Sequence, residues 1–83
     1  MTEHEIKIQS IYFIAVARGE KTFEVRYNDR GYQKGDLVTL AEVNNVGQPT
    51  GQRIKKKIGF VTGFEQKESW VVFSLLDLDR SGQ

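Results

Sequence analysis

The chain has 83 residues with 12 basic and 11 acidic side chains, which gives a formal net charge of +1. A chain of this length cannot form two independent cores, so we expect a single domain over 1–83, with 79–83 as a frayed tail. The near-neutral charge argues against duplex binding through bulk attraction to phosphates. The lack of cysteine excludes disulfides, thiolate catalysis and a sulfur-rich zinc site.

The sequence shows no metal-binding, membrane or export signal. With one histidine and no cluster of carboxylates at ligand spacing, we expect neither a metal site nor a cofactor. The first residues lack the basic start and apolar run of a secretory signal, and no segment reaches the roughly 20 apolar residues that span a bilayer. We therefore expect a cytoplasmic monomer that does not bind membranes.

An alternating segment near the start of the chain, 5–8, predicts a strand with Ile6 and Ile8 turned toward the core. His4 lies at the entrance to this strand. A lone histidine at such a position is most often a surface or hydrogen-bonded side chain.

A short apolar run over 11–18 predicts the first helix. Ser10 is expected to cap this helix by accepting a backbone N–H from the first turn. Gly19 is expected to end it, because glycine enters the left-handed conformation without a Cβ penalty. Apolar side chains occupy nearly the whole circumference of the run, so the helix should be heavily buried.

The next segment, 22–26, alternates polar and apolar side chains and predicts a half-buried strand. Phe23 and Val25 are expected to face the core. Period-2 geometry then places Glu24 and Arg26 together on the opposite face.

These charged residues allow two interpretations, with Lys21 arriving from the preceding turn. One is an exposed ion pair beside a solvated lysine, which contributes little to stability. The other is a polar pocket between the helix and the sheet.

A polar segment over 27–35 follows, in which Asn28, Asp29 and glycine favour turns. The same segment brings Arg30 and two tyrosines, of which Tyr32 is the second, close to the charged strand. Arginine with nearby aromatic rings suits the holding of a phosphate and the stacking of a base. A plain structured loop is the alternative.

The remaining segments predict a sheet. The run 37–43 has apolar residues of both parities and predicts an interior strand, and 44–51 has the composition of a hairpin loop. The run 69–78 predicts a last strand that is partly buried on both faces. Trp70 is interpreted as a core or barrel-rim residue rather than as a stacking platform.

The alternation over 52–64 predicts one long strand with Ile58 and Phe60 on the same face. Its lysine triplet, 55–57, can contact phosphates, but lysines also protect exposed sheet edges, and we favour the edge-strand interpretation. Gly59 marks a bulge or bend.

The octapeptide 19–26 reads G-x-K-x-x-E-x-R and resembles the signature of the ASCH domains, a branch of the PUA-like β-barrel superfamily. Further positions resemble a small ASCH-related family of unknown function in bacteria and phages. These positions are His4 with Lys7, Tyr12-Phe13, Asn28-Asp29-Arg30 and Gly35-Asp36. The resemblance spans about 4–78.

This resemblance implies an α+β fold: a small PUA-like open β-barrel of about five strands, with one short helix at one mouth. It also implies a polar pocket between that helix and the barrel. There Arg26 or Arg30 would hold a phosphate, and Glu24 would accept from an exocyclic amine. The expected ligand-binding residues are His4, Lys21, Glu24, Arg26, Asn28, Asp29, Arg30 and Tyr32.

The leading functional expectation is a module that binds nucleic acid or a nucleotide, with RNA as the favoured partner. The resemblance also implies a rival, an amidohydrolase acting on an acetylated cytidine with Lys21 and Glu24 as catalytic residues. In such enzymes a threonine stands three residues after the lysine, where this chain has Glu24. A third possibility is a protein-interaction module in which the octapeptide only braces the fold.

Overall fold

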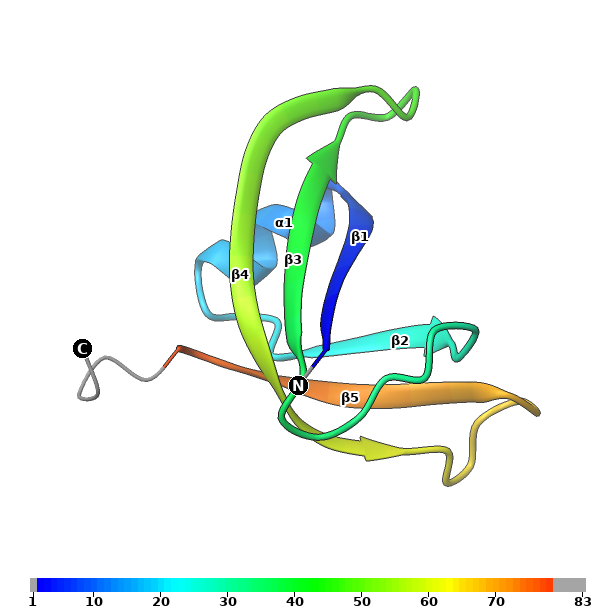
Figure 1. Ribbon diagram of the computed structural model, residues 1–83. Helices are drawn as coiled ribbons and strands as arrows, with labels where there is room; N and C mark the ends of the chain where they lie inside the picture. The colour runs from blue at the N-terminus through cyan, green and yellow to red at the C-terminus, as the bar shows by residue number, and fades with distance from the viewer. Residues whose placement is uncertain (1, 79–83) are drawn as a thin grey trace.

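The computed structural model describes residues 2–78, so the tail expected at 79–83 lies outside the described residues. Five strands and one helix make up the fold (Figure 1). In chain order they are β1 (Glu3–Gln9), α1 (Ser10–Ala17), β2 (Phe23–Tyr27), β3 (Leu37–Val43), β4 (Pro49–Thr62) and β5 (Trp70–Leu76). This confirms a small α+β open barrel with one short helix early in the chain.

The strands form one curled sheet in the order β1-β3-β4-β5-β2, in which only β1 and β3 run parallel. The two edges are therefore β1 and β2, and β4 lies at the centre. The lysine triplet 55–57 belongs to β4, which is central in the strand order rather than an edge strand as expected. Among the described residues, however, Lys55 and Lys56 pair with β3 alone, and pairing with β5 begins at Lys57. Local alternation cannot show which strand has neighbours on both sides.

The long strand β4 bends in the middle and joins two differently oriented halves of the sheet (Figure 1). Its first part pairs with β3 and its later part with β5, and the register shifts between Ile58 and Val61. Gly59 lies at this shift, where an added Cβ would meet Ser74 Oγ at 2.6 Å. The predicted bulge is thus confirmed. It also turns Phe60 out to solvent while Ile58 is buried, so these two residues do not share a face.

A single core fills the concave side of the sheet. Ile6 and Ile8 face inward as predicted. The core residues are Ile6, Ile8, Phe13, Val16, Tyr32, Val38, Leu40, Ile58, Phe73 and Leu75.

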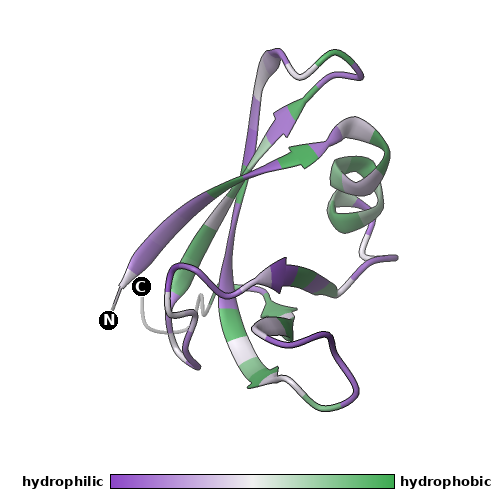
Figure 2. Ribbon diagram, turned by 90° about the vertical axis from the view of Figure 1, so that its right-hand side faces the viewer, coloured by the Kyte–Doolittle hydropathy of each residue, from purple (hydrophilic) through white to green (hydrophobic). Residues whose placement is uncertain are grey.

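The helix α1 follows β1 without a loop and contacts β1 and β3 on the concave side (Figure 2). Only Phe13 and Val16 of this helix are buried, whereas Ile11 and Ile14 are exposed. The expectation of a heavily buried helix was therefore wrong, because the sheet covers one side of α1 only. The part of the chain that the structure describes contains no helix with the length and apolar character needed to cross a membrane.

The ends of α1 match the sequence prediction at one terminus only. Ser10 is the first helical residue rather than a cap, and its Oγ donates to the carbonyl of Val43, 3.1 Å away. This bond ties the start of the helix to the end of β3. Gly19 ends the helix as predicted, with φ of 77°, and the turn delivers Lys21 to the start of β2.

The prediction that Phe23 and Val25 of β2 face the core was wrong, and Glu24 faces inward instead. Glu24 is 5% exposed, while Phe23 and Val25 are 47% and 43% exposed. Alternation shows that two sets of residues face opposite sides, but the neighbouring strand decides which set is inward. Glu24 lies opposite the buried Phe73 of β5, so the polar set faces the concave side.

Candidate functional site

A cleft of about 1100 Å³ lies between the two edges of the sheet, and we call it the seam cleft. One wall is β1, and the other is the segment from Lys21 to Arg30 around β2. Because the sheet curls, strands that are far apart in the sheet order face each other here. The lining residues are Glu5, Ile6, Lys7, Ile8, Gln9, Tyr12, Lys21, Phe23, Glu24, Val25, Arg26, Tyr27, Asp29, Arg30, Tyr32 and Trp70.

Glu24 is the centre of the charged cluster in this cleft. Its Oε1 accepts from Lys21 Nζ, and its Oε2 accepts from Arg26 Nε at 2.8 Å. Lys21 Nζ also donates to the carbonyl of Phe23 at 2.7 Å. A buried carboxylate is tolerated only when it is paired and hydrogen-bonded, and both oxygens of Glu24 meet this condition. The predicted convergence of Lys21, Glu24 and Arg26 is therefore present.

Two arginines bridge the open seam. Arg26 Nη2 donates to the carbonyl of Lys7 at 2.6 Å, and Arg30 Nη1 donates to the carbonyl of Glu5 at 2.7 Å. Both acceptors belong to β1, an edge strand whose backbone groups would otherwise be open to another chain. Between β1 and β2, where the barrel is open, these guanidinium groups bind the β1 carbonyls that a neighbouring strand would otherwise bind.

Two residues expected to bind a ligand, Asn28 and Tyr32, are used by the fold instead. Asn28 Oδ1 accepts from the backbone N–H of Tyr32 at 2.9 Å and so shapes the turn after β2. The Tyr32 ring is buried between His4 and Phe73, with ring centroids 4.8 Å and 4.9 Å away. Burial raises the pKa of Tyr32. Tyr32 therefore forms the floor of the cleft and cannot serve as an open stacking platform, whereas Asp29 does line the cleft.

His4 is buried and bonded to a carboxylate. Its Nε2 lies 2.9 Å from Asp36 Oδ2, which also accepts from the backbone N–H of Gln33. The hydrogen bond to His4 is the main reason that the pKa of Asp36 lies below its ordinary value, and the amides of Gln33 and Thr2 add to this effect. The pair joins β1 to the loop before β3. His4 thus holds the loop that carries the cleft residues, but it does not line the cleft.

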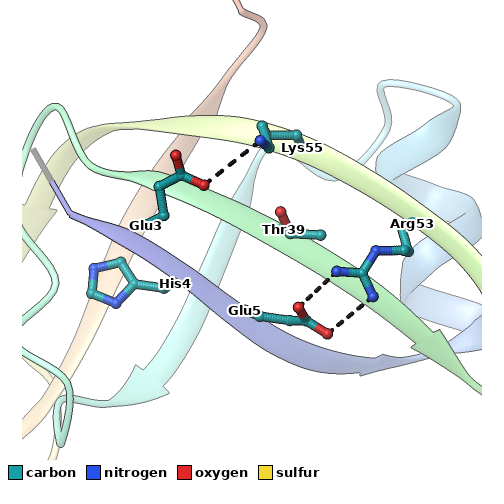
Figure 3. A pocket seen from close by; sticks show the side chains of 6 residues that line it. All are labelled: Glu3, His4, Glu5, Thr39, Arg53 and Lys55. Carbon is teal, nitrogen blue, oxygen red and sulfur yellow. Dashed lines mark hydrogen bonds and ion pairs between the residues drawn. The ribbon is translucent and has the colours of Figure 1, made fainter.

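A second, smaller hollow of about 470 Å³ lies on the opposite, outer face of β1, β3 and β4 (Figure 3). Arg53 Nη2 donates to Glu5 Oε1 at 2.6 Å, and Lys55 Nζ lies 3.7 Å from Glu3 Oε1. Figure 3 shows His4 pointing away from these pairs. The hollow has less than half the volume of the seam cleft and its charges are mutually paired, so it is the weaker candidate site.

Residues 3–75 match a family described as a domain of unknown function, DUF3850. The chain belongs to this family. It is also 39% identical over 59 residues to an uncharacterized 12.9 kDa protein in the GpA 3' region of Escherichia phage P2. That match covers 71% of this chain and 53% of the phage protein, so the chain spans about half the length of this relative.

In this DUF3850 chain, Tyr12, Phe23 and Trp70 were not predicted to line the cleft, whereas Tyr27 belongs to the segment expected to stack a base. Tyr12, Phe23, Tyr27 and Trp70 all line the seam cleft and remain substantially exposed. Phe23 was assigned to the core and Trp70 to the core or rim, because an apolar residue in an alternating strand is normally an inward one. One sign that the Phe23 side chain is exposed was present in the sequence. Glu24 stands between Phe23 and Val25 in β2, so either the charged residue or its two apolar neighbours must face outward.

The described residues of this DUF3850 chain contain no cluster of side chains that could bind a metal ion. Within 2–78, no group of three histidine, aspartate or glutamate side chains is arranged to hold a metal ion. Two of the three carboxylates that line the seam cleft are instead placed against cations. Glu24 meets Lys21 and Arg26, and Glu5 meets Arg53.

Proposed function

We propose that this chain is an ASCH-like domain of the PUA-like type and that its seam cleft binds a nucleotide unit of RNA. The observation that carries the proposal is the meeting of cations and exposed aromatic rings in one cleft. Lys21 Nζ lies 5.0 Å from the ring centroid of Phe23 and 5.8 Å from that of Tyr12. A nucleotide presents an anion and a flat ring, and these groups match cations beside aromatic faces.

The charged residues that line the cleft favour the binding of a ligand with one anionic group. Four basic and three acidic residues line it. Two of the acids are occupied, because Glu24 is bonded to Lys21 and Arg26, and Glu5 is paired with Arg53 on the outer face. The guanidinium of Arg26 has more N–H donors than these contacts use, so it can also hold a phosphate.

The role of Glu24 differs from the one expected from the sequence. Both of its oxygens already accept hydrogen bonds, so reading an exocyclic amine would require it to lose a cation. We assign Glu24 to positioning: it holds Lys21 and Arg26 at the cleft in fixed directions. Its neutral analogue should therefore weaken binding through these neighbours.

Titration of short single-stranded RNAs and free nucleotides at low salt, followed by amide NMR shifts, tests this proposal. We expect saturable binding that weakens about tenfold or more in Lys21→Met and Arg30→Gln, the scale of one lost charged hydrogen bond. Lys57→Gln is the matched control, because Lys57 is an exposed lysine of β4 that does not line the cleft. Absence of saturable binding in the parent protein contradicts the proposal.

Contact between Lys21 and Glu24 also favours the amidohydrolase candidate, since these are the two residues that it needs. A threonine nucleophile is the missing part. Among the residues that line the seam cleft there is no serine or threonine. Incubation with N4-acetylcytidine decides the matter, because release of acetate that stops in Lys21→Ala would establish catalysis and no release would leave binding alone.

A further inference from the structure

The aromatic residues of the cleft form two separate groups along β2. At its start, Phe23 lies with Tyr12 beneath the Lys21 ammonium. At its end, Tyr27 lies opposite Trp70 of β5, with ring centroids 6.1 Å apart and ring planes at 70°. We call these the Phe23 platform and the Trp70 platform.

Both platforms are open to solvent on the same face of the strand. Phe23 is 47% exposed, Tyr27 is 52% exposed and Trp70 is 38% exposed. Phe23 and Tyr27 are four residues apart, and even spacings in a strand share one face. A rise of about 3.3 Å per residue separates their backbone positions by about 13 Å.

The need for a free base face at each platform selects the form of nucleic acid that can use both platforms. Bases stacked in a duplex follow one another at about 3.4 Å along a strand. Bases four steps apart in such a stack would match the platform spacing of about 13 Å, but their faces are covered by neighbouring bases. A base must have a free face to stack on a ring, so the strand must be opened out. An extended single strand meets this condition, whereas a stacked duplex does not.

Two arginines lie near the Trp70 platform. Arg26 is next to Tyr27 in β2 and lines the cleft, with 30% of its side chain exposed. Arg30 follows in the turn after β2 and lines the same cleft. Both guanidinium groups bridge to β1 across the seam. A phosphate of a strand at the Trp70 platform would therefore meet them at the edge of β2, while its base turns to the rings.

We propose that the seam cleft takes a single RNA strand lying along β2, with one base on the Phe23 platform and a second base on the Trp70 platform. This proposal rests on the nucleotide binding proposed above and adds the class of ligand and a second subsite. The rings keep between 38% and 52% of their residue surface exposed, and each base offers a π-face that suits them.

Trp70 allows a direct test, because it is the only tryptophan of the chain. Uridine monophosphate, hexauridylate and a six-base-pair RNA duplex are titrated against the whole chain, and affinity and tryptophan fluorescence are recorded. We expect hexauridylate to bind about 5- to 150-fold more tightly than the monophosphate, the range for one additional stacked base, and to quench Trp70.

Substitution of the second platform separates this proposal from nucleotide binding itself. Tyr27→Leu should reduce hexauridylate affinity toward that of the monophosphate, and by a larger factor than it reduces monophosphate affinity. Trp70→Phe, which keeps a ring, should retain most of the affinity. Phe60→Leu is the matched control, because Phe60 is an exposed aromatic residue that does not line the cleft.

The outcomes are distinguishable. Saturable monophosphate binding with equal hexauridylate affinity and no change in Trp70 fluorescence overturns the second platform and leaves nucleotide binding intact. Equal affinity for duplex and single strand also overturns it. If neither the monophosphate nor hexauridylate binds, nucleotide binding itself fails, and the second platform fails with it.

Discussion

The two ion-pair clusters of this sheet contain the same residue types and differ mainly in burial. On the outer face, Glu5 and Arg53 keep more than half of their side-chain surfaces exposed (Figure 3). In the seam cleft, the Glu24 side chain is 6% exposed and has a cation at each oxygen. Water can replace a lost partner on the outer face but not at Glu24. Burial, rather than the number of pairs, therefore sets the contribution of each cluster to stability.

The largest expected effect comes from Glu24→Gln, which leaves Lys21 and Arg26 without their shared carboxylate. We expect a loss of roughly 3 kcal/mol in the free energy of unfolding, the low end for a broken buried pair, because both cations retain some access to water. Urea unfolding measures it. A loss no greater than that of Glu5→Gln would show that burial does not distinguish the two clusters. A large loss without any ligand-dependent rise in melting temperature would instead favour the bracing role of the protein-interaction alternative.

An intermediate effect is expected at Asp36, a third carboxylate that is buried but bonded to a histidine and to amides. Its pKa is lowered in the folded state, chiefly by the hydrogen bond from His4. Stability from this group is therefore present above its ordinary pKa of 3.8 and is lost as the pH falls below that value.

Asp36→Asn should cost roughly 1–3 kcal/mol near neutral pH, the scale of hydrogen bonds to a charged group. The variant should also lose part of the decline in stability below pH 4. Thermal unfolding from pH 2 to pH 7 measures both effects. If the variant and the parent protein lost stability equally as the pH fell below 4, Asp36 would not be the source of this acid dependence.

A smaller effect, confined to alkaline pH, is expected at Tyr32 on the floor of the seam cleft. Burial raises its pKa above the ordinary value of 10.0, so the folded state favours the neutral phenol. This contribution is present below pH 10 and is lost as the pH rises through the folded-state pKa. Tyr32→Phe should be near-neutral at pH 7 and more stable than the parent protein in the alkaline limb. Chemical unfolding at pH 7 and above pH 10 measures this difference. An equal loss of unfolding free energy above pH 10 in Tyr32→Phe and the parent protein would contradict it.

The smallest effect is expected from Glu5→Gln on the outer face. Arg53 lowers the pKa of Glu5, mainly through their hydrogen bond, but both side chains are solvated. We expect no measurable change in melting temperature at moderate salt, because exposed pairs contribute little and are screened. A marked drop in melting temperature would show that the exposed cluster contributes as much to stability as the buried one. Arg53→Gln serves as the reciprocal control.

Particular residues show how far the sequence alone can be interpreted. The strands and the single helix were predictable, since the periodicity of apolar residues reports local conformation directly. The charged group of Lys21, Glu24 and Arg26 was also predicted to gather, because they are close in sequence. His4 and Tyr32 were assigned to the ligand, whereas each packs against residues distant in the chain. Their roles depend on partners that no local pattern reveals.

The amino-acid sequence by itself determined where strands, helix and turns form, because backbone propensity, alternation and glycine act over a few neighbouring residues. Only the tertiary structure decided which face of β2 is inward and that β4 is central rather than an edge. It also decided that the two edge strands meet across a cleft. These features follow from the curl of the whole sheet and from the burial that each side chain meets when distant strands come together.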